Sequence, residues 1–110
     1  MKIPYSDFEK LDLRVGTILE VQDHPKADKL YILTVDLGEP APRTIVAGLK
    51  TKYTHENLKN KQAVFVVNLE SVTLRGIQSE GMILAASTES KEEVFFIKPE
   101  KEIAPGSKIH

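Results

Sequence analysis

The sequence consists largely of short apolar runs separated by glycine and proline, and this pattern constrains the fold more than any other feature. Between Leu13 and Val21 every second residue is apolar or β-branched, which places those side chains on one face of an extended strand. Gly16 interrupts this run, and a glycine inside a strand often marks a bulge or a bend that small barrels use. The pattern therefore predicts a strand-rich fold that begins with a bent strand.

Further runs have the composition of strands, and only two segments favour helix. The predicted strands cover residues 30–37, 43–47, 63–69, 82–86 and 94–97. Two prolines within residues 39–42 predict a hairpin loop between the second and third strands. A short helix is predicted from Ser6 to Leu11, with Ser6 as its cap and with Phe8 and Leu11 facing inward. Thr54 is expected to cap a second short helix.

The number and order of these elements favour an all-β fold, a five-stranded OB barrel with short helices and carboxyl-terminal extension strands. A chain of 110 residues has room for one core, so we expect a single domain that spans residues 1–110. OB folds bind ligands across their second and third strands and through the adjoining loops. Residues 29–47 and the loops beside them are therefore the first place to search for a site.

The composition and motifs of the sequence argue against several classes of protein and several kinds of site. The chain has no cysteine, so it contains no disulfide, thiolate metal site or cysteine nucleophile. No apolar run reaches the length of a membrane span, and residues 1–12 lack the apolar core of a secretion signal, so we expect a cytoplasmic location. His24, His55 and His110 lack the spacing of metal ligands, and His24 before Pro25 is interpreted as a turn residue. With no phosphate loop, nucleophile elbow or acid pair, we expect no catalysis, metal or cofactor.

The distribution of charge is more informative than its sum. The formal net charge is −1, which argues against nucleic-acid binding by bulk positive charge. Residues 26–75 nevertheless contain eight basic and five acidic residues, whereas both flanking parts are acidic. This mildly basic middle is compatible with a binding surface and equally with an ordinary solvated surface.

Several local patterns occur together in a particular order. They are Asp12–Gly16 (DLRVG), His24–Leu30 (HPKADKL), Val46–Leu49 (VAGL), Asn68–Leu69 (NL), and finally Arg75–Gly76 (RG) followed by Ser79–Met82 (SEGM) and Leu84–Ala86 (LAA). The ordered set, over residues 8–109, resembles the tRNA-binding domain of methionyl-tRNA synthetase carboxyl termini, structure-specific tRNA-binding proteins and endothelial-monocyte-activating-type cytokine precursors. The resemblance implies an OB fold, a symmetric homodimer formed through carboxyl-terminal extensions, and recognition of tRNA by its overall shape. It also implies a role as the tRNA-binding (beta) subunit or accessory domain of a methionyl-tRNA synthetase catalytic chain.

The resemblance and the expected OB binding face together suggest candidate RNA-binding residues. They are Lys26, Lys29, Arg43, Lys50, Asn68, Arg75, Ser79 and Met82. The cations would bind phosphate oxygens, the Ser79 hydroxyl would donate a hydrogen bond, and Met82 would offer an apolar platform. Each has a simpler interpretation: solvated surface for the cations, a turn for residues 79–82, and an amide that satisfies nearby backbone groups for Asn68. The loop 39–42 has no basic residue at an edge where RNA contact is expected.

The apolar run near the carboxyl terminus does not alternate with polar residues. It contains Val94, Phe95, Phe96 and Ile97, and both of its faces need cover. We expect a dimer interface here, and burial within the monomer beneath the amino-terminal helix is the alternative. Tyr31 and Tyr53 are expected in the core rather than stacked on bases.

Two other functions remain open. The same family contains an export-related chaperone, which would hold unfolded polypeptides in an apolar groove lined by Met82, Phe95 and Phe96. A general single-strand binder would need stacking aromatics, and the chain has only three tyrosines and four phenylalanines. The patterns at residues 24–30 and 79–82 favour tRNA binding.

Overall fold

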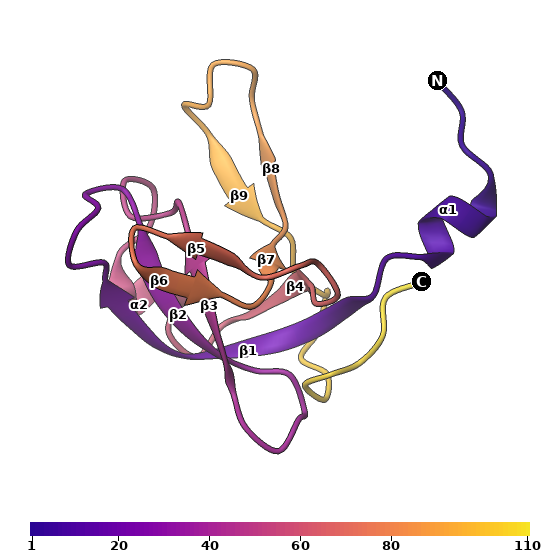
Figure 1. Cartoon of the computed structure of the whole chain (residues 1–110), viewed down its shortest axis with the longest axis horizontal. Coiled ribbons are helices and arrows are strands. Elements are labelled where there is room, and N and C mark those ends of the chain that lie inside the picture. Colours follow the sequence, from indigo (N-terminus) through magenta and orange to yellow (C-terminus); the bar gives the residue numbers. More distant parts are fainter.

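The computed structural model describes residues 1–110, and its centre is an antiparallel sheet curled into a nearly closed barrel (Figure 1). The five strands of this sheet are β1 (Leu13–Asp23), β2 (Tyr31–Asp36), β3 (Arg43–Ala47), β4 (Gln62–Val66) and β7 (Met82–Ile83). They are hydrogen-bonded in the order β3-β2-β1-β4-β7. The prediction of an all-β, five-stranded OB barrel is confirmed.

Strand β1 contributes to both halves of the barrel because it changes partner along its length. Its first five residues pair with β4, and its remaining residues pair with β2 through an irregular register. Gly16 lies next to this change of partner. A Cβ atom at Gly16 would lie 2.6 Å from Val35 Cγ1 and 2.9 Å from both Leu37 Cδ2 and Phe65 Cδ1. The predicted bend therefore coincides with a position where only glycine fits.

Hydrogen bonds between β3 and the segment before β7 nearly close the barrel. The backbone N–H of Glu80 donates to the Thr44 carbonyl at 2.8 Å. The Thr44 N–H in turn donates to the Glu80 carboxylate at 3.3 Å, and the Val46 N–H donates to the Ser79 hydroxyl at 2.9 Å. These bonds occupy polar backbone groups that an open edge strand would leave unpaired.

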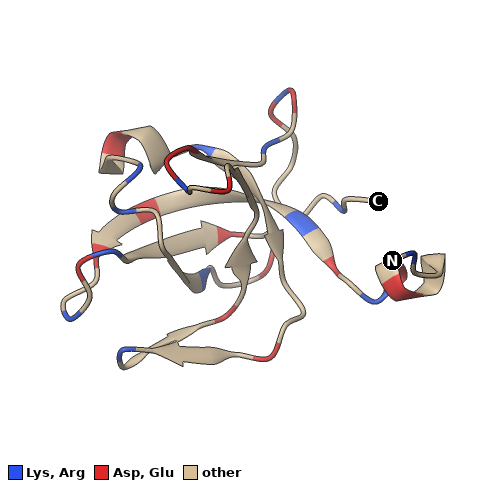
Figure 2. Cartoon of the chain, turned by 90° about the horizontal axis from the view of Figure 1, so that it is seen from above, with Lys and Arg blue, Asp and Glu red and all other residues tan.

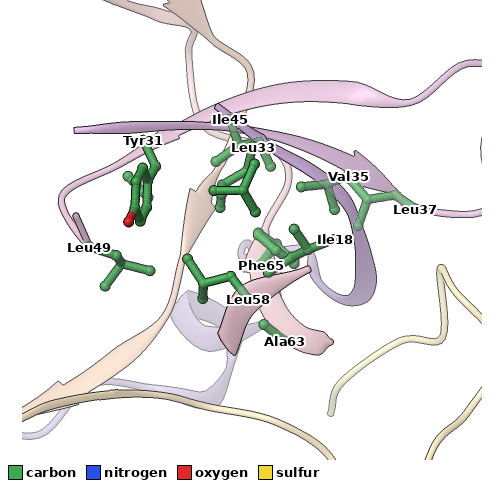
Figure 3. Packing of buried hydrophobic residues seen from close by; sticks show 12 residues of the cluster. Ile18, Tyr31, Leu33, Val35, Leu37, Ile45, Leu49, Leu58, Ala63 and Phe65 are labelled. Carbon is green, nitrogen blue, oxygen red and sulfur yellow. The ribbon is translucent and has the colours of Figure 1, made fainter. Parts of the chain in front are cut away.

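The core lies inside this barrel, where apolar side chains from four strands and one helix converge (Figure 3). Strand β2 contributes Tyr31, Leu33 and Val35, which are buried and alternate with half-buried residues. Helix α2 (His55–Leu58) contributes Leu58, which is fully buried. The Thr54 hydroxyl accepts a hydrogen bond from the Asn57 N–H at 3.3 Å, which confirms Thr54 as the cap of this helix.

Two hairpins lie outside the five-stranded sheet (Figure 1). Strands β5 (Val72–Leu74) and β6 (Ile77–Ser79) form the first one, which lies between β4 and β7 in the chain and which the sequence did not predict. Strands β8 (Ala85–Ser87) and β9 (Val94–Phe96) form the second, which projects away from the barrel. The predicted strand at residues 82–86 is thus two short strands, β7 and β8, with different partners.

The amino-terminal helix differs most from its prediction. Helix α1 (Tyr5–Glu9) lies away from the barrel and buries none of its residues (Figure 1). Its cap position is Pro4 and makes no side-chain hydrogen bond, so Ser6 as cap is wrong. Phe8 and Leu11 are 36% and 42% exposed, so their predicted inward orientation is also wrong. The reason is that no surface of the same chain lies beneath this helix. Neither helix has the length and apolar character needed to cross a membrane.

Candidate nucleic-acid interface

Two loops meet beside a hollow at one end of the barrel. The first is the loop of residues 24–30 between β1 and β2, and the second is the turn of the β5–β6 hairpin. Arg75 and Gly76 form that turn with φ values of 52° and 89°, the two positive values that a two-residue type I′ hairpin turn requires. The hollow has a volume of about 390 Å³ and is lined by Ala27, Asp28, Lys29, Leu30 and Arg75.

Three of the predicted cations belong to these two loops and make no ion pair. Lys26 and Lys29 are exposed on the first loop, and Arg75 is exposed at the hairpin turn. None of them lies within 4.0 Å of a carboxylate oxygen, whereas Arg14 and Arg43, the two basic side chains of the barrel strands, do. Asp28 lines the hollow together with Lys29 and Arg75, and with Lys26 on the same loop these four side chains sum to +2. We call these three cations the loop cations.

His24 connects the two loops through both nitrogens of its ring. The Lys26 backbone N–H donates to Nδ1 at 3.0 Å, and Nε2 lies 2.9 Å from the Leu74 carbonyl oxygen. Because a carbonyl only accepts and a backbone N–H only donates, the two bonds form together when Nε2 is the donor and Nδ1 is the acceptor. The His24 side chain is buried, with the residue 4% exposed. The prediction of a turn residue is correct but misses this bridging role.

Lys50 lies close to the first loop but is already paired. Its Nζ is 3.5 Å from Oδ2 of Asp23, the last residue of β1. His55 Nε2 is 2.8 Å from the other oxygen of the same carboxylate. The hydrogen bond from His55, and then the charge of Lys50, lower the pKa of the Asp23 carboxyl. Lys50 is therefore a positioned cation beside the loop cations, with part of its charge balanced.

The side chains of Arg43 and Ser79 are committed to the barrel. The Arg43 guanidinium donates two bonds of 2.8 Å to Glu39, one of 2.6 Å to the Val67 carbonyl and one of 3.1 Å to the Glu80 carbonyl. The hydrogen bonds to Glu39 raise the pKa of Arg43. Ser79 is 5% exposed, and its hydroxyl accepts from Val46 and donates to the Gly81 carbonyl at 3.0 Å. The structure therefore gives both residues a role in closing the barrel.

Asn68 and Met82 also lie apart from the hollow between the loops. The Asn68 amide donates to the Lys10 carbonyl at 2.7 Å and accepts from the Asp12 N–H at 2.8 Å. This confirms the interpretation in which Asn68 satisfies backbone groups, and it attaches the amino-terminal segment to the barrel. Met82 is exposed on β7, where it pairs with Val66.

A larger hollow of about 440 Å³ lies elsewhere, between the start of β1 and the loop that joins β2 to β3. Its charged side chains form two opposite pairs. Arg14 Nε is 2.6 Å from the Asp12 carboxylate, and Arg43 is bound by Glu39. The hydrogen bond from Arg14 lowers the pKa of Asp12. Because its charges cancel in pairs, this hollow offers no free cation to a phosphate.

The apolar run at β9 is divided between the two faces of its hairpin. Val94 and Phe96 are half-buried against the core, and the rings of Phe96 and Tyr53 lie 5.1 Å apart. Phe95 and Ile97 are 59% and 43% exposed. Burial beneath the amino-terminal helix is wrong, because that helix lies away from this hairpin (Figure 1). Phe95 of β9 and Ile97, the residue that follows this strand, therefore remain uncovered.

The two tyrosines are part of the core, as predicted. Tyr31 is 4% exposed, and its hydroxyl donates to the Tyr53 carbonyl at 2.6 Å. Tyr53 is half-buried, and its hydroxyl accepts from the Phe96 N–H at 3.4 Å. Neither ring is free to stack on a base. Figure 2 shows acidic and basic residues interspersed along the chain.

Comparison with known sequences extends these observations. Residues 13–108 match the family model described as "Putative tRNA binding domain". The methionine-tRNA ligase of Pyrococcus horikoshii is 53% identical over 107 residues, which are 97% of this chain and 14% of the ligase. A probable methionine-tRNA ligase of Oryza sativa is 43% identical over 100 residues, which are 91% of this chain and 12% of that protein. The chain thus spans only a small part of these relatives.

Solved structures with the same fold include a MetRS-related protein, a chaperone and one domain of a larger protein. A MetRS-related protein from Pyrococcus horikoshii superposes with a TM-score of 0.91 at 32% identity over the full length of both chains. The chaperone CsaA from Bacillus anthracis gives a TM-score of 0.89 at 30% identity, also over both full chains. The carboxyl-terminal domain of Plasmodium vivax p43 gives 0.86 at 36% identity over 91% of this chain and 59% of that one.

Proposed function

The chain belongs to the family of tRNA-binding domains, and from this premise we propose that it is a non-catalytic module that binds folded tRNA through its loop cations. The observation that carries the proposal is the position of Lys26, Lys29 and Arg75. Lys29 and Arg75 line one hollow, Lys26 lies on the same loop as Lys29, and a buried histidine joins this loop to the hairpin that carries Arg75. Loops at this place in an OB fold are where such barrels bind nucleic acid.

We infer that recognition relies on the tRNA backbone. Arginine and lysine side chains on loops bind phosphate oxygens and read the position of the backbone rather than the identity of bases. Stacking on unpaired bases would need exposed aromatic rings near the cations, but Tyr31 and Tyr53 are held in the core. Lys50 adds a fourth cation beside the loops once phosphate competes for its bond with Asp23. A contact set of this kind selects an RNA by the spacing of its phosphates.

The biological role that we propose is the delivery of tRNA to a methionyl-tRNA synthetase in the cytoplasm. The chain is similar to one segment of methionine-tRNA ligases, and a binding module tethered to or associated with such an enzyme raises the local concentration of its substrate. In this role the module acts as the accessory domain or beta subunit. The catalytic chain supplies the aminoacylation chemistry.

We also propose that two copies form a homodimer through uncovered apolar side chains. The amino-terminal segment exposes Ile3, Tyr5 and Phe8. Phe95 of β9 and Ile97, directly after this strand, are also exposed. These side chains form no core in a single copy, and covering them is favourable because it removes apolar surface from water. Analytical ultracentrifugation of the wild type and of Phe95→Asp tests this part. A wild-type protein that stays monomeric at micromolar concentration would contradict it.

The experiment that tests RNA binding compares two RNAs of equal length. Labelled tRNA and an unstructured RNA are titrated with the protein at moderate salt, and dissociation constants are taken from fluorescence anisotropy. We expect tighter binding of the folded tRNA, because only a fixed fold presents phosphates at the spacing of the loop cations. Equal affinity for both RNAs would exclude recognition of tRNA shape.

A second candidate function is that of a chaperone for unfolded polypeptides. The exposed side chains of Phe95 and Met82 favour it, together with the structural similarity to the chaperone CsaA. Light scattering of a denatured client protein would detect suppressed aggregation. The triple variant Lys26→Gln, Lys29→Gln, Arg75→Gln separates the two functions, because it removes the loop cations and leaves the exposed apolar side chains in place. Loss of tRNA affinity with unchanged suppression of aggregation would assign the two functions to different surfaces.

A further inference from the structure

We propose that His24 is a positioning residue that holds the β5–β6 turn against the loop of residues 24–30, so that the loop cations form one phosphate-binding surface. This inference rests on the proposed function. His24 itself touches no RNA in this arrangement, because its ring is 4% exposed and both of its nitrogens are bonded to the protein. It affects binding indirectly, because its two hydrogen bonds position the backbone at Lys26 and at the residue before Arg75.

The two segments that His24 joins are otherwise weakly connected. Within the first loop, the backbone is held by bonds of 3.1 Å between the His24 N–H and Leu30 and of 3.4 Å between the Leu30 N–H and Ala27. The β5–β6 hairpin has strands of only three residues, and its base is fixed to β3 through Ser79. The bond from His24 to Leu74 is the hydrogen bond that ties the far end of this hairpin to the loop.

The position of this bond matters because Leu74 directly precedes Arg75. Arg75 has a φ of 52°, a left-handed conformation that is unfavourable for a residue with a side chain. Fixing the carbonyl immediately before it restricts the backbone at the turn and therefore the direction in which the guanidinium leaves the hairpin. Without the bond, the turn and its cation move independently of Lys26 and Lys29. A polyanion would then have to order the two loops when it binds, at a cost in affinity.

The two ring nitrogens permit an experiment that separates the two bonds. In His24→Gln, the side-chain amide nitrogen occupies the place of Nε2 and retains a donor for Leu74. In His24→Asn, the shorter side chain retains an acceptor for the Lys26 N–H, two residues on, and loses its reach to Leu74. His110→Asn is the matched control, because it makes the same substitution at the exposed carboxyl-terminal residue.

We expect His24→Asn to weaken tRNA binding by about three- to tenfold, the range that the loss of one hydrogen bond predicts. His24→Gln should remain within about twofold of the wild type, since the bond to Leu74 is kept. Arg75→Gln provides a second background. In that background, His24→Asn should cost little further affinity, because the residue through which it acts has been removed. A general loss of stability would instead affect both variants and both backgrounds alike.

Amide hydrogen exchange gives a readout that needs no RNA. If His24 holds the hairpin, the amides of β5 and β6 exchange faster in His24→Asn than in the wild type, in His24→Gln and in His110→Asn. Unchanged exchange in the hairpin overturns the inference, and so does an affinity loss of the same size in the Arg75→Gln background. A wild-type protein without preference for folded tRNA refutes the proposed function instead, and the exchange rates still decide whether His24 fixes the hairpin.

Discussion

Removing the three loop cations together should flatten the salt dependence of tRNA binding. The variant is Lys26→Gln, Lys29→Gln, Arg75→Gln. Each neutralised phosphate contributes about 0.7 to 0.9 to the slope of log affinity against log salt concentration, so three unpaired cations contribute about 2 to 3 units. Between about 50 mM and 200 mM salt, the wild-type affinity should therefore fall about 20- to 40-fold more than that of the variant. Lys26, Lys29 and Arg75 carry this effect because no ion pair within the protein already compensates them.

The control for this measurement removes the same charge at another place. Lys61, Lys98 and Lys101 also make no ion pair, and they line a separate hollow of about 190 Å³ together with Glu100 and Glu102. Replacing these three lysines with glutamine should leave most of the wild-type slope intact. Anisotropy titrations of labelled tRNA at four salt concentrations yield each slope. If the two triple variants lose the same slope, binding depends on diffuse charge, and the reasoning from the loop cations is refuted.

Three further predictions concern stability. Gly16→Ala should lower the free energy of unfolding, measured in urea, by about 1 to 3 kcal/mol, because the new Cβ would overlap three core side chains. Gly48→Ala is the control and should be nearly neutral, because a Cβ there would lie 3.9 Å from Leu30 Cδ2. Asp12→Asn should destabilise the protein at neutral pH. Because folding lowers the pKa of Asp12, its carboxylate contributes to folding stability above its ordinary pKa of 3.8, and this contribution is lost as the pH falls below that value. The stabilities of the variant and the wild type should therefore converge in acid unfolding curves. Tyr31→Phe should cost about 1 kcal/mol in thermal unfolding by removing the bond to Tyr53, and a change in tRNA affinity would contradict its assignment to the core.

The parts of the fold that the sequence predicted correctly depend on local patterns. Strand β2 is an example, since the alternation of Tyr31, Leu33 and Val35 is visible in the sequence and is also the alternation of burial in the structure. The β5–β6 hairpin was missed because its strands are short and its turn has arginine where asparagine or glycine is usual. The apolar stripe of α1 identified a face of the helix but contained no information about the surface that would cover it.

The candidate site also combines features that local sequence patterns predict with features that depend on tertiary contacts. The sequence nominated the cations as candidates for RNA binding, and their availability depends on contacts that the sequence only partly contains. Arg43 and Glu39 are four residues apart, so their pairing was within reach of sequence analysis. Lys50 and Asp23 belong to different elements, and only the barrel brings them together. His24 preceding Pro25 indicated a turn, whereas its partner Leu74 lies 50 residues away and follows from the tertiary fold alone.

The left-handed backbone of Arg75 creates a conflict between thermal stability and affinity for RNA. The residues that stabilise this turn best lack the charge that would bind phosphate. Asparagine or glycine adopts this conformation with less strain, of the order of 1 kcal/mol, so a laboratory selection for heat resistance would favour either of them at the turn. Each replacement would discard the guanidinium that the proposed interface needs. A variant of this domain that is stabilised against heat at this turn is therefore expected to bind tRNA more weakly, because it lacks the guanidinium at the tip of the hairpin.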